Sequence, residues 1–234
     1  MPPEPSNSSG MKTFSIIWAG QIFSLIGSAM SQFALIIWAY QITERATALA
    51  LVAFFGFAPT VLFSPFAGAL VDRWNRKLTM MLSDLATGLV TLVILYLYIT
   101  GSLQIWHLYV TSAFAGFFQA FQWPAYSATI SMLIPKKQYT RASGMMSLAQ
   151  YGSGILAPIL AAALLKPIGI SGILIVDLVT LVIAITTLLI VTIPQPERTI
   201  EDLEKPNTFW QDSMFGFKYI LQRPSLFWLQ QPEW

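Results

Sequence analysis

Long apolar segments that are almost free of charge are the feature that most constrains this chain. They occupy residues 14–40, 47–71, 78–99, 105–134, 141–165 and 170–193. A helix of about 20 apolar residues covers the ~30 Å hydrocarbon layer of a bilayer, so each segment is long enough to span one. Backbone groups cannot stay unpaired in lipid, which leaves helices or closed barrels. Because strict two-residue alternation is absent, the segments predict six transmembrane helices.

Composition excludes several functional classes. Only 10% of the residues are charged, against about 25% in a typical soluble domain. The chain has no cysteine and one histidine, His107, which rules out disulfides and thiolate metal sites and gives no basis for a histidine metal centre. No phosphate loop, dinucleotide fingerprint or nucleophile elbow is present. We therefore expect no enzymatic activity, no cofactor, no metal and no nucleic-acid partner.

The positions of lysine and arginine predict the orientation in the membrane. In a six-span topology only Arg45 and Lys166 fall on one side. The opposite side holds Lys12, Arg73, Arg76, Lys77, Lys136, Lys137, Arg141, Arg198, Lys205, Lys218 and Arg223. Cytoplasmic loops are rich in such residues, so we expect both termini to be cytoplasmic.

Composition also predicts the domain organisation. Residues 1–12 are polar and proline-rich, as in a disordered cytoplasmic tail, and residues 13–193 would form the six-helix transmembrane bundle. Residues 194–224 are charged and would form a cytoplasmic linker with a short amphipathic helix. We expect residues 225–234 to be the truncated start of a seventh span, and the chain to be incomplete.

Matched features indicate an internal repeat. The second and fifth spans both carry glycine and proline in mid-helix, and the first and fourth both carry a polar stripe. This matching favours an all-α membrane fold of two inverted three-helix repeats, as many secondary transporters have. The alternative is that glycine and proline are simply common in membrane helices.

The polar stripes predict a cavity. Residues three or four apart share a helix face, and one such face of the first span holds Gln21, Ser24, Ser28 and Gln32. The fourth span repeats the pattern with Ser112, Gln119, Gln122, Tyr126 and Thr129. Glutamine is costly in hydrocarbon without a partner or water. We expect the substrate cavity to be lined by Gln21, Gln32, Gln119, Gln122 and Tyr126; hydrogen bonding between helices without a cavity is the alternative.

Two carboxylates, Asp84 and Asp177, lie inside spans. An aspartate at a helix centre costs about 2.5–3.5 kcal/mol on the insertion scale, so each is a functional candidate, here for proton coupling. The alternatives are that Asp84 pairs with a basic loop residue, or that either aspartate joins neighbouring helices. Neither lies at the midplane, which favours the alternatives.

The connection "GALVDRWNRK" concentrates charge directly after the second span. Its basic residues would anchor it in the cytoplasm and bridge to other helix ends, whereas the alternative is a positive loop with an incidental aspartate. The connection resembles the G-x-L-x-D-R-x-G-R-K signature of the major facilitator superfamily, which lies between spans two and three. Asn75 replaces the second glycine, a mild departure because asparagine tolerates a left-handed conformation. The resemblance implies a gating loop formed by Gly68, Asp72, Arg73, Arg76 and Lys77.

A weaker match lies in the fifth span. "GILAPILAA" resembles the antiporter motif G-x-x-x-G-P-x-x-G-G and keeps Gly154 and Pro158, with alanine at three glycine positions. Residues 12–230 are similar to the branch that contains macrolide and siderophore exporters, as the amino-terminal half and central linker of a twelve-span protein. The usual arginine of the fourth span is missing from residues 112–127, which counts against a standard proton relay there.

The resemblance implies a secondary active transporter in a bacterial inner membrane. It would export a small hydrophobic molecule of drug, macrolide or siderophore type by alternating access, coupled to protons. Its partners would be the lipid bilayer, the substrate, protons, and a missing carboxyl-terminal half or second subunit. The alternative is a truncated, non-transporting membrane fragment, or a half-transporter that requires a partner.

Overall fold

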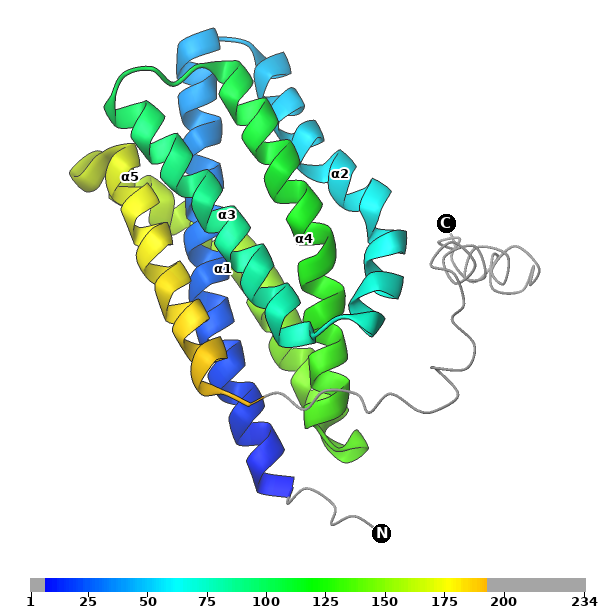
Figure 1. The fold of residues 1–234 in the computed structure, drawn as a ribbon. Coiled ribbons are helices and arrows are strands. Elements are labelled where there is room, and N and C mark those ends of the chain that lie inside the picture. Colours follow the sequence, from blue (N-terminus) through cyan, green and yellow to red (C-terminus); the bar gives the residue numbers. More distant parts are fainter. Residues whose placement is uncertain (1–6, 193–234) are drawn as a thin grey trace, which may run out of the picture.

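The computed structural model describes residues 7–192, with the side chains of residues 10–192 except Ala69, Asp72 and Arg73. The elements are α1 (Asn7–Thr43), α2 (Ala46–Arg73), α3 (Arg76–Ile99), α4 (Ile105–Leu133), the 3-10 turn η1 (Lys136–Gln138) and α5 (Tyr139–Ile190). They lie side by side in one elongated bundle (Figure 1). No strand occurs in this part of the chain, so the all-helical prediction is confirmed there.

Helix boundaries agree with the expected spans except at the two ends of the described region. The fourth span was expected at 105–134 and α4 covers Ile105–Leu133. Helix α1 begins at Asn7, inside the segment expected to be a tail. The predicted linker and the start of a seventh span, residues 194–234, lie outside the described residues.

Helix α5 has 52 residues and contains a reversal of direction. A straight helix of that length would measure about 78 Å, far more than the ~30 Å hydrocarbon layer. Gly169 interrupts it with φ 67° and ψ −176°, a backbone conformation that is essentially restricted to glycine. The interruption falls in the gap expected between the fifth and sixth spans, and it divides α5 into a first arm, residues 139–168, and a second arm, residues 170–190.

Contacts with α1 show that the two arms run beside each other. The indole Nε1 of Trp18 donates to the carbonyl of Met145 in the first arm, at 2.8 Å. Two residues further along α1, a Cβ on Gly20 would collide with Thr187 in the second arm. Both arms therefore reach the same level of α1, and the chain folds back at the top of the bundle (Figure 1).

By length and hydropathy, four stretches of the described residues could cross a membrane: Gly10–Thr43, Ala46–Gly68, Arg76–Ile99 and Lys136–Ile190. Helix α4 is also long enough, but it does not reach the hydropathy of these four stretches. The fourth stretch contains both arms of α5. The prediction of a membrane fold is thus confirmed, while the count of six crossings stays a prediction.

The outer surface of the bundle is strongly apolar. Phe57, Tyr151 and Ile190 are each about 70% exposed, and many other large apolar side chains share the surface. A water-soluble protein rarely exposes apolar patches of this extent, because contact with water is unfavourable. Lipid is the solvent that suits this surface.

Small residues allow the helices to approach closely. A Cβ on Gly116 of α4 would collide with the carbonyl oxygen of Gly56 in α2. The hydroxyl of Thr60 bonds to both carbonyls, at 2.8 Å to Gly116 and 3.1 Å to Gly56. Glycine and threonine at helix contacts are typical of membrane bundles, where close packing and polar bonds hold helices together.

The apolar core is split into two clusters along the bundle. One contains Phe14, Ile17, Met80 and Leu188. The other contains Met30, Leu108, Ile173 and Leu174. Along α1, the stretch between the clusters carries Gln21, Ser24 and Ser28 of the predicted stripe, and Gln32 follows Met30. The fold therefore holds a polar layer between two apolar ends.

Candidate functional site

A cavity of about 480 Å³ occupies the polar layer, lined by residues from α1, α2, α3, α4 and both arms of α5. All the residues that the stripes assigned to a cavity lie on its wall: Gln21, Gln32, Gln119, Gln122 and Tyr126. The indoles of Trp18 and Trp123 and several apolar side chains complete the lining. The space is large enough for a small organic molecule, and polar groups on its wall can orient one.

Asp84 is buried at the cavity wall, where it joins three helices. One carboxylate oxygen accepts from Nε2 of Gln21 on α1 at 2.9 Å, and the other accepts from Nε2 of Gln122 on α4 at 2.8 Å. The two amides also bond to each other, at 3.2 Å. Among the described residues, Asp84 thus links α3 to α1 and α4, as expected if the carboxylate joins neighbouring helices.

Two polar atoms beside this network have no hydrogen-bond partner in the described part of the chain. They are Oε1 of Gln122 and the hydroxyl of Tyr126, both buried atoms. Gln122 and Tyr126 are four residues apart on α4 and share the face that lines the cavity. A buried polar group without a partner is costly, so both atoms are available to a bound molecule.

Asp177, on the second arm of α5, is the other buried carboxylate of the described residues. It is 4% exposed, and its two carboxylate oxygens accept from Ser28 of α1 and Thr91 of α3, each at 2.9 Å. A Cβ on Gly27 would crowd the backbone of Asp177, so the glycine permits this close contact. Asp177 thus joins α1, α3 and α5, and it also reaches the cavity wall.

The connection between α2 and α3 is short and well capped. The Trp74 amide donates to the Leu70 carbonyl, and the Asn75 side chain accepts from the Leu78 amide at 3.2 Å. Asn75 has φ −67°, so the structure makes no use of its tolerance for a left-handed conformation; it serves as the N-cap of α3. The side chains of Asp72 and Arg73 lie outside those that the structure describes.

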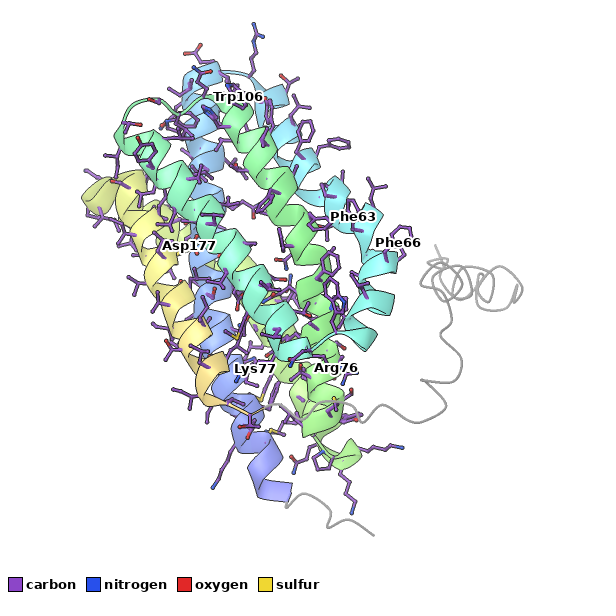
Figure 2. All side chains as sticks on the ribbon, viewed as in Figure 1. Phe63, Phe66, Arg76, Lys77, Trp106 and Asp177 are labelled. Carbon is purple, nitrogen blue, oxygen red and sulfur yellow. The ribbon has the colours of Figure 1, made fainter. Side chains whose placement is uncertain are left out.

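The two remaining basic residues of the connection reach other helix ends. The Arg76 guanidinium contacts the sulfur of Met132 near the end of α4. Lys77 Nζ donates to the carbonyls of Leu189 and Val191, at 3.1 and 2.7 Å, where α5 ends and leaves carbonyls without helical partners. Figure 2 shows Arg76 and Lys77 at one end of the bundle, Trp106 at the other and Asp177 between them.

The glycines of the two family motifs make no close contact in the described structure. A Cβ on Gly68 or Gly154 would meet nothing within 4 Å. Gly154 lies on the cavity wall, and Pro158 lies within the first arm of α5. Close helix contacts occur instead at Gly116 and Gly27, which the motifs did not mark.

Sequence reasoning missed several cavity residues. Thr91 bonds to Asp177, Thr60 joins α2 to α4, and Ser31 is buried on the cavity wall. Thr91 lies seven residues after Asp84, which places both on one helix face, so the spacing could have revealed it.

Comparison with known proteins agrees with this architecture. The family model of the Major Facilitator Superfamily matches residues 17–231. Macrolide efflux protein A of Streptococcus pyogenes is 34% identical over 218 residues, which is 92% of this chain and 52% of that protein. The protein of the same name in Enterococcus faecalis is 32% identical over 176 residues, 74% of this chain and 53% of that protein.

A more distant relative is the uncharacterized MFS-type transporter YfiS of Bacillus subtilis, 25% identical over 165 residues, 70% of this chain and 38% of that protein. The chain spans about half the length of the macrolide efflux proteins that it matches. The predicted resemblance is confirmed, and with it a multi-pass membrane protein. The extent of the family match and the identity to these relatives show that the chain belongs to the Major Facilitator Superfamily.

Proposed function

We propose that this chain forms a six-span half of a secondary active exporter for a small, hydrophobic molecule. The observation that carries the proposal is the cavity of about 480 Å³ between two apolar clusters, with glutamine and aspartate on its wall. In lipid such polar groups are costly unless they face water or a ligand. A transporter needs a binding site of this kind near the middle of the membrane.

The relatives support export as the direction. Two of them carry the name macrolide efflux protein and match 74% or more of this chain. The cavity wall here combines indole rings with amides, which suits a largely apolar molecule that carries a few polar groups.

Helix pairing supports two inverted repeats and six crossings. Helix α1 packs mainly on α5, and α4 packs mainly on α2 and α3. If spans one to three correspond to four to six, these pairings are equivalent, and Asp84 on α3 corresponds closely to Asp177 on the second arm of α5. Helix α1 begins and α5 ends at the end of the bundle that holds Lys77, which an even number of crossings requires (Figures 1 and 2).

The loop between α2 and α3 gates the cavity, and two buried carboxylates couple transport to protons. The end with Arg76 and Lys77 faces the cytoplasm, as the positive-inside rule requires, and the loop with Asp72 controls opening on that side. Asp84 and Asp177 bind and release the coupling protons, because they are the carboxylates on the cavity wall among the described residues. Gly154 and Pro158 shape the first arm of α5.

The test is transport by the complete gene product in a macrolide-sensitive bacterium. Cells that express it should accumulate less radiolabelled erythromycin than cells with an empty vector, and a protonophore should remove the difference. Asp72→Ala should impair export with unchanged protein in the membrane, whereas unchanged export would remove the gating role. Equal accumulation with and without the protein, across a panel of hydrophobic compounds, would refute the exporter.

The second candidate is a half-transporter that requires a partner, or a non-transporting fragment. The observation in its favour is that the chain matches about half of its relatives' length. Expression of the 234-residue chain alone and of the complete gene product, in parallel, separates the two. Export by the 234-residue chain only when a second protein is supplied would favour the half-transporter.

A further inference from the structure

The side chain of Asp177 is surrounded by hydroxyl groups. Its two carboxylate oxygens accept from Ser28 of α1 and Thr91 of α3, each at 2.9 Å. Asp177 and Thr91 are both buried. A hydroxyl group has one hydrogen and two acceptor lone pairs, so each oxygen that donates to the carboxylate keeps lone pairs for a second partner. Hard metal cations are bound by carboxylate and neutral oxygen atoms of this kind.

Ser31 adds a hydroxyl group that has no partner within the described structure. Its side chain is 4% exposed, and its Oγ makes no hydrogen bond to the described residues. Ser31 follows Ser28 by three residues on α1, so both share one helix face, and its hydroxyl lies next to the Asp177 carboxylate. A buried polar group without a partner is costly. An ion bound between Ser31 and Asp177 removes that cost.

A small void lies directly beside these oxygen atoms, between α1, α3 and the second arm of α5. Ser28, Thr91 and Asp177 are on its wall. The same three residues line the main cavity, so an ion can enter the void from there. The void has no room for a water molecule, but a Na⁺ ion that has lost its hydration shell is smaller than water.

Charge at the void favours a monovalent ion. Among the described residues that line the void, Asp177 carries a negative charge and no lysine, arginine or histidine balances it. Burial of a charge without a counterpart is unfavourable, and one positive charge removes the imbalance. Within residues 7–192, as far as they are described, no group of three acidic, histidine or cysteine side chains could hold a metal ion, which counts against a divalent site. An organic cation is too large for the void.

We propose that one carboxylate and three hydroxyl groups form a binding site for a dehydrated Na⁺ ion beside the main cavity. The ligands come from Ser28 and Ser31 of α1, Thr91 of α3 and Asp177 of α5. The ion binds where these three helices meet. Binding does not depend on the exporter, whereas the part of the ion in transport rests on that proposed function: there Na⁺ takes the place of the proton at Asp177.

The first test uses the wild-type protein and needs no variant. The complete gene product in lipid nanodiscs is incubated with radioactive Na⁺, and bound radioactivity is compared with that of empty nanodiscs. The remaining cation of the buffer is N-methylglucamine, which is too large for the void. Binding should saturate, and unlabelled Na⁺ should displace the label at much lower concentration than K⁺, because K⁺ is larger. Binding no greater than that of empty nanodiscs, or equal displacement by K⁺, would overturn the proposal.

Serine substitutions then locate the ion. Ser31→Ala removes a hydroxyl that has no partner in the described structure, so stability in the absence of Na⁺ should not fall. Its Na⁺ affinity should fall about tenfold, the value of one hydrogen bond to a charged group. Ser24→Ala is the matched control, because Ser24 is also buried on α1 at the cavity wall but lies two helical turns from Ser31. If Ser31→Ala binds Na⁺ as tightly as Ser24→Ala, the assignment is wrong.

Two carboxylate variants complete the comparison. Asp177→Asn keeps the shape of the side chain without its charge and should abolish saturable Na⁺ binding. Asp84→Asn removes the other buried carboxylate of the described residues and should keep that binding. Retention of Na⁺ binding in Asp177→Asn, or equal loss in both variants, would contradict a site centred on Asp177.

Transport separates the ion site from the exporter itself. Saturable Na⁺ binding by a protein that exports neither erythromycin nor any other compound of the panel would support the site and refute the exporter. Export without saturable Na⁺ binding would leave the exporter standing and overturn the site. Export together with Na⁺ binding that is weakened in Ser31→Ala is the expected result.

Discussion

The side-chain amide of Gln21 donates to the carboxylate of Asp84 across 2.9 Å, although the two residues are 63 positions apart in the chain. This bond fixes α1 against α3 at the wall of the cavity. Movement of α1 relative to α3 must break or rearrange it, so the same contact that positions Asp84 also links the cavity to the packing of the bundle.

The bond between Gln21 and Asp84 predicts energetic coupling. In a double-mutant cycle with Gln21→Ala and Asp84→Ala, the change in the free energy of unfolding is measured for each single variant and for the double variant. The change in the double variant should differ from the sum of the two single changes by about 0.5–3 kcal/mol. The measurement is denaturation in mixed micelles. Gln32→Ala with Asp84→Ala is the control and should be additive, because Gln32 lies three turns further along α1. Additivity in both pairs would contradict the contact.

The reversal in α5 predicts a specific requirement for glycine. Gly169→Ala should lower the free energy of unfolding by about 1–3 kcal/mol, because φ is +67° there. Gly144→Ala is the matched control: it lies in the same element with open space around a Cβ, and alanine is the better helix former, so a small gain is expected. Thermal unfolding followed by circular dichroism distinguishes them. Equal stability of the two variants would show that the chain does not reverse at this glycine.

Substitution of Lys77 should destabilise the last turn of α5. Lys77→Met removes the donor to the carbonyls of Leu189 and Val191. The substitution should lower the free energy of unfolding by about 1 kcal/mol. Hydrogen exchange of the last turn of α5 should accelerate, while exchange elsewhere in the bundle stays unchanged. Lys137→Met removes a basic residue of η1, between α4 and α5, and should leave that turn as in the wild type. Unchanged exchange in Lys77→Met would mean that the lysine does not cap α5.

Substitution of Asp177 should separate proton coupling from substrate binding. Asp177→Asn should abolish protonophore-sensitive uptake by everted vesicles, yet keep exchange of labelled for unlabelled substrate across the membrane. The physical reason is that exchange needs the cavity but no net movement of protons. Ser28→Ala removes one hydrogen bond to the same carboxylate and should retain active uptake. Full active uptake by Asp177→Asn would remove this residue from the coupling mechanism.

The faces of the helices could be predicted from the sequence, but their neighbours could not. Spacing alone placed Gln21 and Gln32 on one side of the first span, and both line the cavity. That Asp84 meets Gln122, or that Asp177 meets Thr91, depends on which helices lie side by side. Such contacts join residues 38 and 86 positions apart, and no local pattern records them.

Local geometry was predictable where one residue type determines it, and less so elsewhere. The gap between the fifth and sixth spans coincides with the kink at Gly169, since only glycine adopts that conformation readily. Asn75 could satisfy its position in two ways, as a left-handed residue or as a helix cap, and the structure has the cap. Composition could not choose between them.

Accessibility of introduced cysteines tests the membrane topology, on which the whole account depends. The chain has no cysteine, so Asn75→Cys, Ser102→Cys and Lys166→Cys each introduce a unique thiol. A membrane-impermeant maleimide should label positions 102 and 166 in intact cells, and should label position 75 only in inside-out vesicles. Labelling of position 75 from outside intact cells, or protection of position 166 on both sides, would contradict six crossings with the 72–77 connection on the inner side.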